Sequence, residues 1–351
     1  MRWGALGLSG GLLALFATGH ASALLPPSYF WWTGLPASFL PFIATAAFGV
    51  MAAHALARHW LWVGAYSLLL VLFLFRMGVP YGQDAPPNEE TLQILTLNFT
   101  PPDDSPPAQT FLRHAWGTFA NTYDPDIIAV QSMHTYRRGD EVRLFHQLDT
   151  LTALGYEVEP QSASNRLNTY VPVFLRNEGV PRQDVIEMES HRRSGRHITR
   201  SEIEWDEQRF ALYNVHLHSF DRLPFQRLFV RGHYRAAARE FASMYRRGIL
   251  QRVQEARELR EIVAADSLPV LLVGDLNASP FNWEYRHLRG ELQDLAAQSG
   301  ANWRFTWHAE APMVRIDHVL GSRHWRAVHT KVDDYVISDH LPLVVGIRFR
   351  E

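Results

Sequence analysis

The sequence predicts an α/β domain of two packed β-sheets flanked by helices, preceded by a membrane region with three transmembrane helices. Two observations favour this architecture. The first 83 residues contain no acidic side chain and only three basic ones, Arg2, Arg58 and Arg76. The rest of the chain alternates short apolar runs with charged, helix-like segments and holds all 36 Asp and Glu residues. We therefore divide the chain into a membrane region (residues 1–80), a linker (81–90) and a second domain (91–351).

Three stretches of the membrane region are long and apolar enough to cross a bilayer, which takes about 20 residues per helix. They are residues 4–25, 38–57 and 60–79. For the first stretch the alternative is a cleaved signal peptide, because Ala21, Ser22 and Ala23 resemble a small-residue cleavage site. For all three the alternative is a buried soluble bundle, but the region lacks polar residues to cover the outside of one.

The few cations of the membrane region predict its orientation. Arg2 precedes the first span and Arg58 lies between the second and third, whereas the aromatic loop between the first two spans carries no charge. Because cytoplasmic loops carry an excess of cations, the N-terminus is expected inside and the second domain outside the cytoplasm. The acidic linker suits the outer face. Arg76 is a mild exception to this pattern, because it is a cation near the outer end of the third span, although its long side chain could extend outward.

The sequence pattern of the second domain predicts strands that alternate with helices. Apolar or alternating runs predict strands at residues 92–98, 127–131, 170–175, 199–205, 210–217, 270–274, 315–320 and 343–349. Helical patterns cover residues 111–123, 141–154 and 225–265. The last of these carries interleaved Glu and Arg residues, which is typical of a solvated helical face. Many strands with helices outside them predict a two-sheet sandwich.

Polar side chains at the ends of these strands are the candidate site. Asp275 and Asn277 follow a buried-type strand and lie on one side of it, where a carboxylate beside an amide could position a water molecule. The alternative is an ordinary Asx turn before Pro280. Strand alternation also places Asn214, His216 and His218 on one face; here the alternative is a histidine that is simply hydrogen-bonded at a strand end.

A third cluster precedes the last strand. Ser338, Asp339 and His340 are consecutive, and adjacent Asp and His side chains point in different directions, so one could bind a metal while the other meets a phosphate or a water. Asp317, on an earlier strand, could orient His340 and fix its tautomer. The alternative for Asp317 is a salt bridge with an arginine at the edge of the sheet.

Taken in order, six motifs resemble the endonuclease/exonuclease/phosphatase superfamily. They are LTLN (95–98), DIIAVQS (126–132), NVHL (214–217), GDLN (274–277), RIDHV (315–319) and SDHLP (338–342). The resemblance spans roughly residues 91–350, and the layout is most similar to membrane-anchored bacterial members with several N-terminal spans. It implies a four-layer α/β sandwich that hydrolyses phosphoester bonds with Mg²⁺ or Mn²⁺, in an integral protein of a bacterial inner or plasma membrane.

The resemblance also implies site roles. Asn98 and Asp339 would lie at the metal, and Asp275 would align or deprotonate the attacking water. Asn277 and His216 would hold the phosphoryl oxygens.

His340, braced by Asp317, would stabilise the phosphate or shuttle a proton. These roles agree with the chemistry of phosphoryl transfer, which needs mainly positioning and charge stabilisation.

One position departs from the family pattern. The family has Gln-Glu after the second strand, and this Glu is the principal metal ligand, but here Gln131 is followed by Ser132. A neutral hydroxyl is a weaker ligand than a carboxylate for a hard cation. Glu141 could replace the missing carboxylate, although a place at a helix N-terminus is the alternative for it.

The sequence therefore predicts a membrane-anchored, metal-dependent phosphoesterase acting by activated-water attack. The alternative, favoured by Ser132, is an impaired member that binds a phosphorylated ligand or partner without turnover. The expected partners are a phosphoester substrate and the lipid bilayer; nucleic acid is possible, but the net charge of −2 does not indicate it. A basic segment at residues 191–197 could meet phosphates or anionic headgroups, or could be a solvated turn.

Overall fold

The computed structural model describes residues 2–78, 91–99, 106–132, 135–138, 141–144, 147–157, 171–176, 182–186, 188, 198–219, 234–300 and 303–350. The chain forms two compact units. One comprises residues 1–79, 218–257 and 278–288, and the other comprises residues 80–217, 258–277 and 289–351. The first unit thus includes segments from the second half of the sequence, and the division at residues 80 and 91 stays a prediction. The linker 81–90 and the basic segment 191–197 lie outside the described residues.

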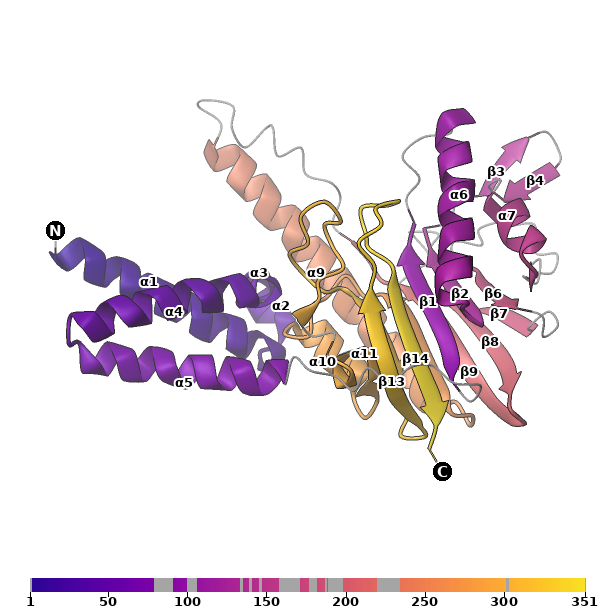
Figure 1. Cartoon of the computed structure of the whole chain (residues 1–351). Coiled ribbons are helices and arrows are strands. Elements are labelled where there is room, and N and C mark those ends of the chain that lie inside the picture. Colours follow the sequence, from indigo (N-terminus) through magenta and orange to yellow (C-terminus); the bar gives the residue numbers. More distant parts are fainter. Residues whose placement is uncertain are drawn as a thin grey trace. The chain divides into compact units, whose positions relative to one another are not determined.

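The first unit is helical (Figure 1). Its N-terminal part contains α1 (Arg2–Ala21), η1 (Ser22–Leu24), α2 (Pro27–Phe30), η2 (Trp31–Thr33), α3 (Gly34–Ser38), α4 (Leu40–Leu56) and α5 (Trp60–Met77). Most of α9 (Tyr234–Ala264) and of α10 (Trp283–Arg289) also belongs to this unit. The segment expected to be a loop between the first two spans is therefore a series of short helices, which Pro27 at the first turn of α2 helps to start.

Two helical segments of the described chain are long and apolar enough to cross a membrane, Leu6–Leu24 and Trp60–Met77. A third crossing requires that Pro27–Ser38 and Leu40–Leu56, which are bent by 66° relative to each other, count as one span. The outward faces of these helices are apolar: Leu8, Phe48, Leu61, Leu68 and Phe75 are all exposed. Such a surface is typical of contact with lipid rather than water.

Polar groups hold these helices together at both ends. Near one end, His54 Nε2 lies 2.9 Å from Ser9 Oγ, and the Tyr66 hydroxyl donates to the Ser9 carbonyl at 2.7 Å. At the other end, Arg76 donates to the carbonyl of His20 at 3.1 Å. The guanidinium of Arg76 thus joins α5 to α1 at this end of the helices, and its extension toward the outer face stays a prediction.

The second unit contains two mixed six-stranded sheets. The first sheet has the order β13 (Trp325–Val332), β14 (Leu343–Phe349), β1 (Leu92–Asn98), β2 (Ile127–Gln131), β6 (Val173–Arg176) and β5 (Tyr156–Glu157). The second has the order β11 (Gln293–Asp294), β12 (Asp317–Gly321), β10 (Val270–Asp275), β9 (Gln208–His216), β8 (Ile198–Trp205) and β7 (Arg182–Ile186). The described part of this unit also contains helices α6 (Pro106–Tyr123), α7 (Gln147–Ala153) and α11 (Leu295–Gln298), the C-terminal end of α9 and a two-stranded sheet.

The alternation of side chains between the two faces of each strand explains the layers of the second unit. On β1, Ile94 faces a core shared with Phe210 and Val273 of the other sheet. The next residue, Leu95, faces the opposite way and packs with Trp116 of α6. Because successive side chains of a strand point to opposite faces, one face of this sheet packs on the second sheet and the other on α6. The predicted α/β sandwich is confirmed.

One predicted helix is wrong in its first half. Residues 141–144 form β4 (Glu141–Leu144), paired antiparallel with β3 (Thr135–Arg138), and only α7 is helical in the stretch predicted as a helix. The physical reason lies in the period: Val142 and Leu144 alternate with polar residues, as in a strand. Glu141 is thus not at a helix N-terminus, and the alternative considered for it is wrong.

A polar contact fixes the two sheets against each other directly behind the candidate site. Gln131, at the end of β2, donates from Nε2 to Asn214 Oδ1 of β9 at 2.7 Å. Asn214 Nδ2 in turn donates to the carbonyls of Val130 and Pro172. A Cβ at Gly274 on β10 would lie only 2.2 Å from the Val215 carbonyl oxygen. The close approach of these strands requires glycine at position 274.

We expect Gly274→Ala to destabilise the second unit by about 2–3 kcal/mol, because it adds a steric clash to a backbone φ of +125° that only glycine adopts readily. The melting temperature of the detergent-solubilised chain should fall by roughly 5–10 °C. Gly117→Ala is the matched control, since a Cβ there meets no atom within 4 Å and should be neutral or slightly stabilising within α6. Equal melting temperatures for the two variants would contradict the packing described.

Candidate active site

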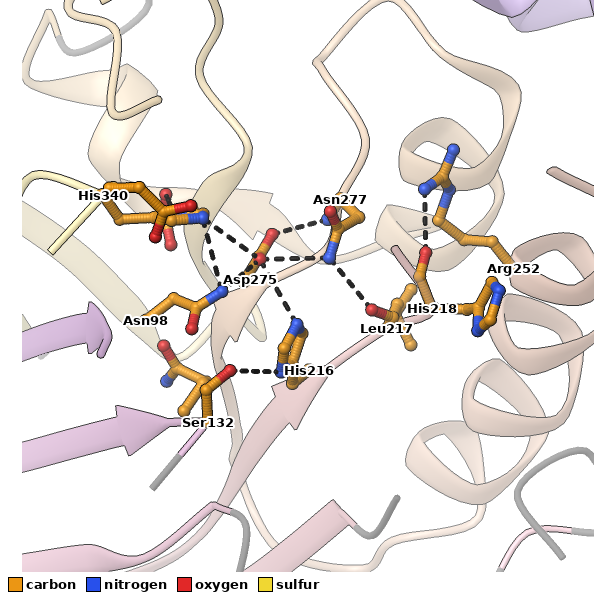
Figure 2. A network of polar contacts seen from close by, with 12 residues as sticks. Asn98, Ser132, His216, Leu217, His218, Arg252, Asp275, Asn277 and His340 are labelled. Atoms are coloured by element: carbon orange, nitrogen blue, oxygen red, sulfur yellow. Dashed lines mark hydrogen bonds and ion pairs between the residues drawn. The ribbon is translucent and has the colours of Figure 1, made fainter. Parts of the chain in front are cut away.

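Asp275 is the centre of the candidate site, at the C-terminal end of β10, and it is fully buried. Its Oδ1 accepts a hydrogen bond from the backbone N–H of Asn277 at 2.7 Å, which is the Asx-turn contact considered from the sequence. Its Oδ2 accepts from Asn277 Nδ2 at 3.0 Å. The turn and the site are therefore not alternatives, because one carboxylate oxygen closes the turn and the other faces the site (Figure 2).

Asn98 brings the end of β1 to the same carboxylate. Its Nδ2 donates to Asp275 Oδ2 at 2.8 Å and lies 3.3 Å from His340 Nε2. Ser338 Oγ donates to the Asn98 backbone carbonyl at 2.7 Å, so the segment that carries His340 is tied to the end of β1. Contacts between two sheets and the last connecting segment thus converge on one buried oxygen.

His340 and Asp317 form the expected pair. Their Nδ1 and Oδ2 atoms are 2.9 Å apart, and both side chains are almost fully buried. The alternative partner for Asp317, a neighbouring arginine, is engaged elsewhere: Arg315 makes a two-pronged contact with Asp294 at 2.6 and 3.2 Å. Asp317 is therefore placed to orient His340 so that Nε2, 3.7 Å from Asp275 Oδ2, faces the centre of the site.

Burial and the charges of neighbouring groups together shift the pKa values of His340, Asp275 and Asp317 from their ordinary values. Burial alone would lower the pKa of His340, but the carboxylates of Asp317 and Asp275 outweigh it and raise this pKa to about 9. Burial and the negative charge of Asp317 raise the pKa of Asp275 to about 6, against the opposing effect of His340. The pKa of Asp317 stays below its ordinary value, because the charge and hydrogen bond of His340 exceed the effect of burial. At neutral pH the site contains an imidazolium.

Ser132 and His216 form the remaining part of the site. Ser132 follows β2 directly, and its Oγ lies 3.2 Å from His216 Nδ1 at the end of β9. The other ring nitrogen, Nε2, is 3.6 Å from Asp275 Oδ2. Both residues are 4% exposed. Ser132 thus occupies the strand end expected from the sequence, and its hydroxyl faces an imidazole.

The residues expected at the metal offer oxygen ligands, which suit a hard divalent cation, but few of these ligands carry a negative charge. Asn98 Oδ1 is buried and has no hydrogen-bond partner among the described residues, which suits an amide oxygen that ligates a metal. Asp339, half-buried beside His340, offers a carboxylate. Separately, ligand atoms of Asp275, Asp317 and His340 lie within 4.8 Å of one another. The acceptor oxygen of Asn98 and the carboxylate of Asp339 are ligands of the kind that Mg²⁺ and Mn²⁺ prefer.

The structure brings together Asn98, Ser132, His216, Asp275, Asn277, Asp317 and His340. His218 does not join them: its backbone N–H donates to Glu255 at 2.7 Å within the first unit. The contacts of Ser132 with His216 and of Gln131 with Asn214 were not expected. Both depend on how the two sheets are stacked, which strand periodicity does not encode.

The His340–Asp317 pair predicts a pH dependence of the metal-free protein. Because the pKa of His340 is raised, its protonation stabilises the folded state fully below about pH 6.5, and this contribution is lost as the pH rises through about 9. In Asp317→Asn the pKa of His340 should fall, because the charge of Asp317 contributes most to raising it. An NMR titration of the imidazole signals in EDTA measures the pKa of His340 in the wild type and in Asp317→Asn. The His340 signal is identified as the one that is missing from the spectrum of His340→Gln. An unchanged pKa would mean that Asp317 does not act on His340.

Comparisons with known proteins agree with this geometry. Residues 115–340 match the model of the Endonuclease/Exonuclease/phosphatase family. Among solved structures, a humanized D. rerio TDP2 with 14 mutations superposes with a TM-score of 0.50 at 16% identity, over 74% of this chain and 100% of that one. Truncated Caenorhabditis elegans TDP2 gives 0.50 at 18% identity, over 74% and 98%. At such identities these similarities concern the fold. No curated protein shows a matching sequence.

The family match covers most of the second half of the chain and includes every residue of the described site except Asn98. The two mixed sheets, with the polar cluster at their strand ends, have the architecture that the motifs implied. The chain belongs to the endonuclease/exonuclease/phosphatase family.

Proposed function

We propose that the protein is a membrane-anchored, metal-dependent phosphoesterase that hydrolyses a phosphodiester or phosphomonoester by attack of an activated water. The observation that carries this proposal is the convergence of Asn98, Asn277, His216 and His340 on the buried carboxylate of Asp275. A buried carboxylate that only formed a structural ion pair would not need two amides and two imidazoles around one of its oxygens. Members of the family are generally phosphoester hydrolases, and this constellation supports the same class of reaction here.

Each group has a role that its position supports. Asp275 Oδ2 accepts hydrogen bonds from the side-chain amides of Asn98 and Asn277 and can align a water or take its proton. His216 would present a ring nitrogen to a phosphoryl oxygen. Asn277 Nδ2 already donates to Asp275 Oδ2 and to the Leu217 carbonyl, so Asn277 would hold a phosphoryl oxygen by giving up one of these hydrogen bonds. His340, charged at neutral pH, would stabilise the negative charge that develops on the phosphate or deliver a proton to the leaving oxygen.

A divalent cation, Mg²⁺ or Mn²⁺, would be held by Asn98 Oδ1 and the Asp339 carboxylate. When bound, it would neutralise charge on the phosphoryl group. Among the described side chains, Asp339 is the carboxylate proposed at this position, because Ser132 replaces the expected Glu. Mn²⁺ binds oxygen sites in the same way and ranks low in affinity among the transition metals, so the choice between the two ions rests on availability.

A second function is favoured by the same residue. Without the expected carboxylate, the site could hold a phosphorylated ligand or partner through Asn277, His216 and His340 and release it unchanged. One measurement distinguishes the two functions. An enzyme turns over a phosphoester, and this turnover depends on Asp275, whereas a binding protein shows no turnover.

We also propose that the first unit anchors the protein in a bacterial inner or plasma membrane by three spans, with residues 91–351 as an extracytoplasmic domain. The exposed apolar faces of α1, α4 and α5 support the anchor. The cations Arg2 and Arg58 support the orientation.

To test the enzymatic function, we would assay the purified full chain with Mg²⁺ or Mn²⁺ against nucleic-acid, phospholipid, inositol-phosphate and nucleotide phosphoesters. Asp275→Asn and His340→Ala should each reduce turnover at least 100-fold while the protein remains folded. Asp206→Asn is the matched control, because Asp206 is exposed in the turn between β8 and β9. If the wild type turns over and both site variants retain full activity, the catalytic assignment is wrong.

A reporter fused after Glu351 tests the orientation. A periplasmic reporter such as alkaline phosphatase should be active, and a cytoplasmic one such as green fluorescent protein should be dark, because the third span would carry the chain outside. The same fusions made after Arg58 should give the reverse pattern. Fluorescence of the fusion at Glu351 would overturn the extracytoplasmic placement.

A further inference from the structure

The first half of α9 is basic and belongs to the same unit as the helices proposed to cross the membrane. Residues 234–250 contain four arginines and one acidic residue, Glu240, although the whole chain has a net charge of −2. We propose that Arg239, Arg246 and Arg247 bind the headgroups of anionic phospholipids at the membrane surface. This inference rests on the membrane anchor of the proposed function and is independent of the phosphoesterase activity.

The short helices α2, η2 and α3 connect α1 to α4. Because α1 and α4 would cross the bilayer in opposite directions, the connection between them has to lie at a membrane surface. Pro27–Ser38 is bent by 66° relative to Leu40–Leu56, so the connection runs across the direction of α4 rather than along it. Its side chains Tyr29 and Trp32 are exposed, and Tyr and Trp are enriched where a membrane meets water. The connection therefore marks the level of the lipid headgroups.

Helix α9 packs directly on this connection. The rings of Tyr245 in α9 and Trp31 in η2 are 6.2 Å apart and belong to one apolar cluster with Ile249. A Cβ at Gly34 of α3 would lie 2.9 Å from the Tyr245 hydroxyl oxygen and 3.4 Å from Ile249 Cδ1. The absence of a side chain at position 34 thus lets α9 approach α3 closely. These contacts hold Tyr245 at the level of the headgroups.

The three arginines lie close to Tyr245 and are exposed. Arg246 and Arg247 follow it directly, and Arg239 precedes it by six residues, which is about 9 Å along the helix axis. Arg239 and Arg246 are seven residues apart, about two helical turns, so they share one face of α9. Among the described residues, no carboxylate forms an ion pair with any of the three.

Burial distinguishes these arginines from another one of the same helix. Arg252, on the buried face of α9, donates from Nε to Glu284 Oε1 at 3.2 Å and from Nη1 to the His218 carbonyl at 2.9 Å. The charge of Arg252 is therefore compensated inside the protein, whereas the charges of the three exposed arginines are not. A basic helical face beside a membrane surface attracts anionic lipids, whose phosphates would accept hydrogen bonds from the guanidinium groups.

The experiment measures whether anionic lipids gather around these arginines. Because the chain has no cysteine, Ala236→Cys provides a single site for a fluorescent label at an exposed position of α9, three residues before Arg239. The labelled full chain is placed in phosphatidylcholine nanodiscs that contain a fixed fraction of a nitroxide lipid with either a phosphatidylglycerol or a phosphatidylcholine headgroup. We expect at least twofold stronger quenching by the phosphatidylglycerol form. The difference should disappear near 1 M salt, where the Debye length is about 3 Å.

Two triple variants separate the proposed surface from the overall charge. The preference for phosphatidylglycerol should be lost in the variant with Arg239→Gln, Arg246→Gln and Arg247→Gln. The matched control removes the same charge from three exposed arginines of the second unit, by Arg113→Gln, Arg304→Gln and Arg323→Gln, and should keep the preference.

Equal quenching by the two lipids in the wild type, or an equal loss of preference in both triple variants, would overturn the proposal. The absence of quenching by either lipid would overturn it as well, because α9 would then lie away from the membrane surface. A chain that stays in solution without detergent or lipid would contradict the membrane anchor itself. None of these outcomes depends on turnover of a phosphoester.

Discussion

The site depends on one buried negative charge, the carboxylate of Asp275. Removing an ionised carboxylate from water is costly unless hydrogen bonds and opposite charges compensate it. Here Asn98, the backbone and side chain of Asn277, His216 and His340 supply that compensation. Each comes from a different strand end or connecting segment. The need to solvate Asp275 therefore fixes the same groups that a phosphoryl group would use.

This arrangement requires the two sheets to be held in one relative position. Gln131 and Asn214 join them through a buried amide–amide hydrogen bond, and Gly274 leaves room for the Gln131 side chain, because a Cβ there would lie 3.0 Å from Gln131 Nε2. Both features lie one residue from site residues: Gln131 precedes Ser132, and Gly274 precedes Asp275. Packing between the sheets thus sets the distance between Ser132 and His216. Stability and site geometry are consequences of the same contacts.

Much of the second unit could be predicted from the sequence, because its central strands are continuous apolar runs. The bounds of β1, β2 and β14 agree with the predicted ones residue for residue. Edge elements could not be predicted in this way. Half of the residues of β13 are polar, and Glu141 lies on a strand rather than a helix. The motifs predicted Asp317 beside His340, but the Ser132–His216 contact depends on the stacking of two sheets. The structure likewise shows that His218, one alternation beyond His216, leaves the sheet.

The presence of Ser132 in place of the family's Glu determines how tightly the site binds a divalent cation. Opposite charges about 4 Å apart attract by roughly 4 kcal/mol at an effective dielectric of 20, and desolvation of the carboxylate offsets part of this energy. The most direct measurement is a calorimetric titration of Mg²⁺ and Mn²⁺ into the wild-type chain and into Ser132→Glu. We expect millimolar affinity in the wild type and binding at least tenfold tighter in the variant, because the added carboxylate would face the metal held by Asn98 and Asp339. Equal affinities would contradict a metal position beside residue 132.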